Sequence, residues 1–180
     1  MSNQTQLRPV NDKKGLSDFI NVPWHIYAND TQWIPPLKFE RRDALSAKHP
    51  YFHHAIWRAW VLYDGALPVG RISAQIDALH QVRYGDHTGY FGMLEAPNDP
   101  KAFETLFKAA QDWLTENDQK RCVGPFNLGI NQEIGILVDG FNTPPFFMMA
   151  HSPPYYHPRI LENGFEGVKD LLAYEVSPDF

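Results

Sequence analysis

Residues 62–71 read Leu62-Tyr63-Asp64-Gly65-Ala66-Leu67-Pro68-Val69-Gly70-Arg71. Asp-Gly is a frequent turn dipeptide of antiparallel hairpins. An aromatic and β-branched run, Ala55 to Tyr63, precedes the turn, and a second apolar run, Val69 to Ile76, follows it. The pattern predicts a β-hairpin here.

Further helices and strands are expected on both sides of this hairpin. Upstream, Leu7 to Val10 could form a short strand, and Asp12 to Asp30 one or two helices. Pro23 should start the second of these, because proline is tolerated in the first turn of a helix. Downstream, the pattern predicts a strand at Gly89 to Glu95, a helix from Pro100 to Asn117, a strand at Arg121 to Gly124, a short helix from Pro154 to Asn163 and a final strand at Leu171 to Val176.

This order predicts an α+β fold, a mixed and mainly antiparallel sheet flanked by helices. The long helix should begin at Asp99 as N-cap and bury Phe107 and Trp113 against the sheet. A chain of 180 residues fits a single domain, residues 1–180. Residues at about 125–153 are rich in proline and glycine with little periodicity, and predict an irregular insertion.

Composition excludes several classes of function. The net charge is −5 and the basic residues are scattered, which argues against nucleic acid as a partner. The longest strictly apolar run, residues 146–150, is far too short to cross a membrane. A single cysteine, Cys122, and a polar start favour the cytoplasm. The eight histidines lack metal-ligand spacing, so we expect no metal.

Several local motifs resemble those of the GNAT superfamily of acyl-CoA-dependent N-acyltransferases. The hairpin is similar to the one in which GNAT proteins turn at Asp-Gly and return through Val-Gly, and Gly164-Phe165 resembles the Gly-Phe after their last helix. The motifs that resemble an uncharacterised bacterial GNAT-like family, specifically its divergent N-terminal half, are Tyr90-Phe91-Gly92-Met93-Leu94-Glu95, Gly124-Pro125-Phe126-Asn127, Leu137-Val138-Asp139-Gly140-Phe141 and Pro154-Tyr155-Tyr156.

The resemblance implies acyl transfer from acetyl-CoA or another acyl-CoA to an amine. It implies that Met93 and Leu94 bind the pantetheine arm, that Lys101 lies near the pyrophosphate, and that Glu95 and Tyr156 act as catalytic base and acid. Glu95 could instead be a solvated carboxylate at a strand end, and Arg71 is expected to pair with an acid such as Glu95 or Asp77.

The phosphate-binding loop departs from the GNAT pattern. Residues 96–102 read Ala-Pro-Asn-Asp-Pro-Lys-Ala and contain no glycine. Pro97 and Pro100 lack N–H donors, and an N-cap at Asp99 would occupy those that a phosphate needs. Ile160 stands where GNAT proteins usually have a tyrosine, and Tyr156 lies one turn earlier. We therefore expect acetyl-CoA to bind with a dissociation constant of about 1 mM or weaker.

The polar residues of the irregular segment have two interpretations. Asn127, Asn131 and Glu133, with Tyr155, could bind the substrate, or the Asn-Gly and Asp-Gly neighbourhoods could simply form turns.

The alternative function is a non-catalytic GNAT-like domain that packs against a catalytic second half or partner, or against its own copy, through residues 144–156. In the resembling family a second half would begin near Phe180. Some of the four bulky residues Phe146 to Met149 should then lie exposed or line a cleft.

Overall fold

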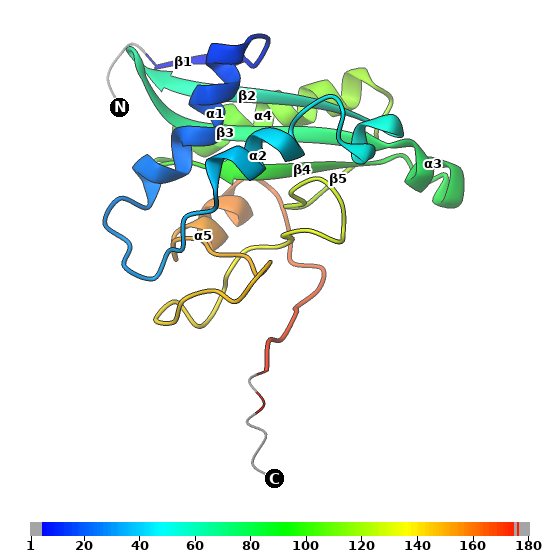
Figure 1. Cartoon of the computed structure of the whole chain (residues 1–180). Coiled ribbons are helices and arrows are strands. Elements are labelled where there is room, and N and C mark those ends of the chain that lie inside the picture. The colour runs from blue at the N-terminus through cyan, green and yellow to red at the C-terminus, as the bar shows by residue number, and fades with distance from the viewer. Residues whose placement is uncertain (1–4, 175, 177–180) are drawn as a thin grey trace.

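The computed structural model describes residues 5–174 and 176. Its centre is a five-stranded sheet in the order β1-β2-β3-β4-β5, with all neighbours antiparallel except β4 and β5, which are parallel (Figure 1). The strands are β1 Thr5–Pro9, β2 Ala55–Asp64, β3 Leu67–Asp77, β4 Thr88–Glu95 and β5 Arg121–Val123. The helices are α1 Lys13–Ile26, α2 Lys38–Ala44, α3 Ala78–Tyr84, α4 Pro100–Glu116 and α5 Tyr156–Glu162, with a 3-10 turn η1 at Pro50–His53.

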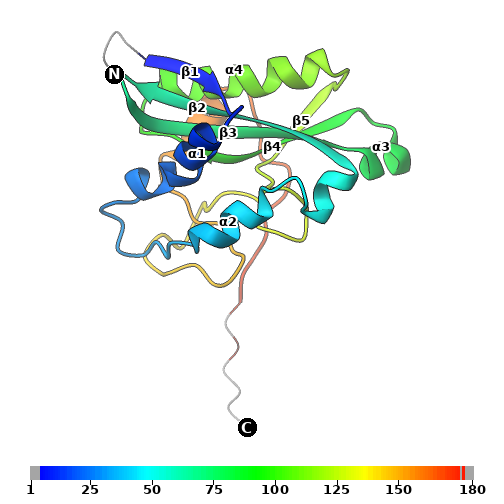
Figure 2. The ribbon, with the colours of Figure 1, turned by 45° about the horizontal axis from the view of Figure 1, so that its top comes forward.

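Helices cover both faces of the sheet. Figure 2 shows α4 on one side and α1 and α2 on the other. Alternation along β2 divides the core accordingly: Trp60 and Leu62 face the cluster under α4, whereas Val61 and Tyr63 face the cluster under α1. The predicted α+β fold and the β2–β3 hairpin are confirmed.

The long helix α4 begins as its sequence predicts. The Asp99 side chain accepts a hydrogen bond from Lys101 N, and Pro100 occupies the first turn. Phe103 and Phe107 are fully buried. Trp113 also lies on the sheet side, where its ring is edge-on to Trp60 at 6.4 Å between centroids, but it is only partly buried, so the predicted burial is incomplete for this residue.

Pro23 lies inside one continuous helix, so the prediction that it starts a second helix is wrong. A proline at this position cannot donate to the carbonyl of Phe19, four residues earlier. Arg71 on β3 replaces the missing donor, with Nη1 3.1 Å from Phe19 O. The guanidinium of a buried arginine therefore satisfies the carbonyl that the proline leaves free.

The last predicted strand does not form. Residues 171–174 and 176 contain no strand, and Leu172, Tyr174 and Val176 are exposed. β5 is only three residues long, and residues 171–174 pair with no strand of the sheet. Helices α2 and α3 were not expected from the sequence.

The stretch from 124 to 155 has no helix or strand apart from one isolated bridge between Phe126 and Ile134. It returns along β4 and passes under the α1–α2 side of the sheet before entering α5 (Figure 1). Among the described residues no helix has the length and apolar character needed to span a membrane.

Candidate functional site

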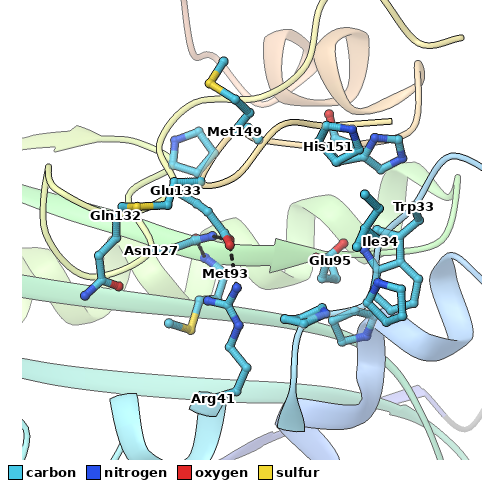
Figure 3. Close-up of a pocket in the computed structure, with 18 of the residues that line it drawn as sticks. Trp33, Ile34, Arg41, Met93, Glu95, Asn127, Gln132, Glu133, Met149 and His151 are labelled. Atoms are coloured by element: carbon cyan, nitrogen blue, oxygen red, sulfur yellow. Dashed lines mark hydrogen bonds and ion pairs between the residues drawn. The ribbon is translucent and has the colours of Figure 1, made fainter. Parts of the chain in front are cut away.

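A cleft of about 650 Å³ lies on the α1–α2 side of the sheet, at the carboxyl end of β4. Its walls are the α1–α2 connection on one side and the irregular segment on the other, and Met93, Leu94 and Glu95 of β4 lie between them (Figure 3). The cleft thus forms where two segments without regular structure face each other across a strand end.

One part of the cleft is strongly apolar. Ile34 and Leu37 of the α1–α2 connection are 59% and 54% exposed, and Phe146 and Phe147 on the other wall are 67% and 91% exposed, although all four line the cleft. The prediction that some of Phe146 to Met149 lie exposed or line a cleft is confirmed. Large apolar side chains that remain exposed around a hollow indicate a binding surface.

Glu95 lies at the floor of the cleft in a closed polar network. Its Oε2 accepts hydrogen bonds from the hydroxyls of Tyr27, at 2.8 Å, and Tyr156, at 2.7 Å, and its Oε1 lies 3.4 Å from Arg71 Nη2. The Glu95 side chain is 12% exposed, so the interpretation as a solvated strand-end carboxylate is wrong. Of the two acids expected as partners for Arg71, the structure selects Glu95.

The electrostatics of this network follow from burial. Burial raises the pKa of Glu95, against the opposing effects of Arg71 and the two tyrosines, and lowers the pKa of Arg71. Burial and the charge of Glu95 both raise the pKa of Tyr156 and of Tyr27 well above the usual range. The hydroxyl proton of Tyr156 is therefore held by Glu95, and both residues act here as parts of a fixed network.

The hydroxyls of Tyr155 and Tyr156 also form hydrogen bonds with the backbone of Ala96, which follows β4. The N–H of Ala96 donates to the Tyr156 hydroxyl at 3.0 Å, and the Tyr155 hydroxyl donates to Ala96 O at 2.8 Å. Tyr155 therefore lies behind the strand end and is not among the residues that line the cleft.

A second polar chain closes the opposite end of the cleft. Arg41 of α2 pairs with Glu133 Oε1, and Glu133 Oε2 accepts from Asn127 Nδ2 at 3.0 Å. Asn127 Oδ1 in turn accepts from Met93 N at 2.7 Å, at a bulge of β4 where Met93 has a φ of 48°. The structure brings Asn127 and Glu133 into the cleft lining, as the sequence suggested, but Asn131 is exposed and outside it.

Several residues that define the cleft could not be recognised from the sequence. No motif marks Tyr27 at the end of α1, Trp33 in the α1–α2 connection or Arg41 within α2. His151, the histidine that lines the cleft, lacks a neighbouring ligand in the sequence. Among the described residues no group of three His, Cys, Asp or Glu side chains could hold a metal ion. Cys122 is half-buried, and burial raises its pKa to about 12, which keeps the thiol protonated.

Several backbone groups along β4 that an acyl-CoA would bind already form hydrogen bonds within the chain. A pantetheine arm paired with this strand needs free backbone groups, but Phe126 N donates to Phe91 O at 2.7 Å and Asn127 covers Met93 N. A Cβ at Gly92 would lie 1.8 Å from Phe126 O, which shows how closely the chain packs there.

The phosphate end is closed in a similar way. The Asp99 carboxylate occupies the N–H of Lys101, whose side chain is exposed. These contacts occupy backbone groups at the position where the sequence resemblance places an acyl-CoA, and the roles of Met93, Leu94 and Lys101 in holding it stay predictions.

Solved structures share this fold. The chain superimposes on an aminoglycoside acetyltransferase, meta-AAC0020, from an uncultured soil metagenomic sample with a TM-score of 0.58, at 11% identity over 97% of both chains. It also matches 43% of a tandem GNAT protein from the clavulanic acid biosynthesis pathway, with a TM-score of 0.57 at 15% identity over 89% of this chain. A third match, AAC(6')-Iy in complex with a bisubstrate analogue, has a TM-score of 0.53 at 13% identity over 97% of this chain and 99% of that one. The protein has the GNAT fold.

Sequence relatives are more similar but longer. The chain is 47% identical to "Protein YghO" of Escherichia coli K12 over 97% of its own length and 45% of that protein. It is also 47% identical to "Bacterial ceramide synthase" of Caulobacter vibrioides, over 93% of this chain and 44% of that protein. No protein-family model matches. The chain thus spans a little under half the length of these curated relatives.

Proposed function

We propose that this chain is the amine-binding half of an acyl-CoA-dependent N-acyltransferase whose substrate is a primary amine carrying a long apolar chain. In this proposal the acyl-CoA is held by the part of the longer protein that lies outside the chain. The observation that carries the proposal is the contrast between the two candidate sites: the cleft is open, whereas the β4 edge is filled by Phe126, Asn127 and Tyr155.

The chemistry of the cleft supports an amphiphilic ligand. Apolar side chains such as Trp33, Ile34 and Phe147 line it together with the charged pair Arg41–Glu133 and the buried Glu95. A ligand with one polar head and one long chain would satisfy both parts. The similarity to a bacterial ceramide synthase agrees with this, because a ceramide is the amide of a long-chain amino alcohol.

The proposal is tested by titrating the 180-residue chain separately with sphinganine, below its aggregation concentration, and with acetyl-CoA. We expect micromolar binding of the amine and a dissociation constant of about 1 mM or weaker for acetyl-CoA. Ile34→Asp should weaken amine binding, because it places a charge on the apolar wall. Val82→Asp, on α3 and 88% exposed, is the matched control and should leave it unchanged. Micromolar binding of acetyl-CoA would contradict the division of roles.

A second candidate function is a non-catalytic domain that packs against a second half or another copy. The 91% exposure of Phe147 favours it, because such a residue is easily buried in an interface. Replacing Phe147 and Met149 with serine separates the two functions. Loss of self-association, or of binding to the rest of the protein, with amine binding intact would support the interface; the reverse pattern would support the cleft wall.

A further inference from the structure

Asp30 and His151 connect the two walls of the cleft. Asp30 belongs to the α1–α2 connection and His151 to the irregular segment, and Asp30 Oδ2 lies 2.8 Å from His151 Nε2. The backbone on both sides is anchored, since Asp30 Oδ1 accepts from Gln32 N at 2.9 Å and His151 O lies 3.2 Å from the Tyr27 hydroxyl, whose single proton it shares with Glu95 Oε2. The imidazole therefore has a fixed position.

The partner of Nε2 decides which nitrogen carries the proton. Burial alone would raise the pKa of Asp30, but the hydrogen bonds from His151 and Gln32 leave it lowered, so Asp30 is a carboxylate that can only accept. Nε2 must then be the donor. In the neutral ring Nδ1 is left with a lone pair, and it is an acceptor.

This acceptor has no partner within the described part of the chain. The His151 side chain is 7% exposed, and Nδ1 is buried without a hydrogen bond. A buried polar atom without a partner costs free energy, and such atoms are uncommon in folded proteins. His151 lines the cleft, so a ligand that displaces the groups now covering Nδ1 would supply the missing donor.

The position of His151 in the cleft suits the head of an amphiphile. Figure 3 shows His151 at one end of the cleft near Trp33 and Ile34, with Glu95 below it and the Arg41–Glu133 pair to the left. The oxygens of Glu95 are already taken by two tyrosines and Arg71, and Glu133 is paired at both oxygens. Nδ1 of His151 therefore remains as an unused acceptor among these groups.

We propose that the Asp30–His151 pair binds the N–H donor of the ligand's head group, a primary ammonium or amine, through Nδ1 of the imidazole. Asp30 is a positioning residue, because it acts by fixing the tautomer. The assignment rests on the proposed function, in that it places the amine of that substrate class at one end of the same cleft.

The test uses two ligands that differ only in their donors, decylammonium and decyltrimethylammonium. Both carry one positive charge and the same chain, but the trimethylated head has no N–H. Calorimetric titration of the chain below the micelle concentrations should show decylammonium binding about tenfold more tightly, the size expected for one hydrogen bond to a charged group.

Two variants and a control complete the test. Asp30→Asn keeps the shape but donates its own N–H to Nε2, so the ring proton moves to Nδ1 and the acceptor is lost. His151→Phe keeps a ring without nitrogen. Both should bind the two cations equally, and Asp30→Asn should also gain affinity for an acceptor-only ligand, methyl decanoate. Asp86→Asn, in the His80–Asp86 pair on and after α3, is the matched control and should retain the tenfold preference.

The outcomes separate this assignment from the proposed function. If the wild-type chain binds neither cation, the proposed function and the assignment of Nδ1 are both wrong. If it binds the two cations equally, or if Asp30→Asn and His151→Phe retain the preference, the cleft remains an amine site and the assignment of Nδ1 is wrong. The assignment is supported if Asp30→Asn and His151→Phe lose the preference for decylammonium and Asp86→Asn keeps it.

Discussion

Replacing Gly92 with alanine should detach the segment that closes the β4 edge. An added Cβ would lie 1.8 Å from Phe126 O and 2.7 Å from its carbonyl carbon. Ordinary carbon contacts begin near 3.4 Å, and the obstacle is backbone, which cannot rotate away. Gly92→Ala must therefore move the backbone at Phe126 by more than an ångström relative to the strand.

The cost follows from the bonds that hold this backbone. Phe126 N donates to Phe91 O, Gln75 Nε2 donates to Phe126 O and Met93 N donates to Asn127 Oδ1, each at 2.7 Å. At about 1 kcal/mol net for each bond, their loss destabilises the fold by about 3 kcal/mol. In a chain of this length that lowers Tm by roughly 6–12 °C.

Urea unfolding of Gly92→Ala and wild type measures this loss directly. The m-value should stay constant while the midpoint falls. Gly129→Ala is the control in the same segment, since its Cβ would meet only ring carbons of Tyr51 at 3.8 and 3.9 Å. A loss below about 1 kcal/mol in Gly92→Ala, or an equal loss in both variants, would refute the close packing of the segment on β4.

Three further predictions concern the buried network and the aspartate. Arg71→Met should lower the unfolding free energy by about 3–5 kcal/mol, because it leaves Glu95 without its cation. In a Pro23→Ala background the new N–H can bond to Phe19 O, so this loss should shrink by about 1 kcal/mol. Strictly additive urea-unfolding energies for the two changes would disprove the link between Arg71 and Pro23. Tyr156→Phe removes the donor to Glu95 and the acceptor of Ala96 N, and should lower the unfolding free energy by about 2–3 kcal/mol, whereas Tyr84→Phe, at a side chain 60% exposed, should change it little. Asp30 has a lowered pKa, so its stabilising contribution is present above the unfolded value of about 3.9 and is lost as the pH falls below it. The difference in unfolding free energy between wild type and Asp30→Asn should shrink over that range, and a constant difference would contradict the hydrogen bond between the Asp30 carboxylate and His151.

Local signals predicted the elements that depend on local chemistry. The turn at Asp64-Gly65 and the cap at Asp99 sit where the sequence placed them, because each is decided by neighbouring residues. Pro23 misled the prediction for the opposite reason. Its tolerance inside α1 depends on Arg71, which bonds to Phe19 across 52 positions of sequence.

The candidate site was predictable only in part. Glu95 and Tyr156 were named from their motifs, and they are hydrogen-bonded to each other. The remaining contacts of the cleft are long-range: Tyr27 to Glu95 spans 68 positions, Arg41 to Glu133 spans 92 and Asp30 to His151 spans 121. Spacing in the sequence carries no information about such pairs. The final strand was predicted from strand propensity alone, and residues 171–174 form none, because a strand also depends on pairing that local sequence does not reveal.

The segment of residues 138–150 contributes one wall of the cleft through its second half, residues 145–150. Among the described residues, its backbone hydrogen bonds are the local turns from Thr143 N to Gly140 O and from Met149 N to Phe146 O. Opening this wall breaks few hydrogen bonds besides those of His151, so we expect the wall to open at a lower free energy than the sheet. Its amides should exchange with solvent long before those of β2 and β3. A bound amphiphile would slow that exchange while leaving the sheet unchanged, and hydrogen exchange would thus reveal occupancy of the cleft without a label on the ligand.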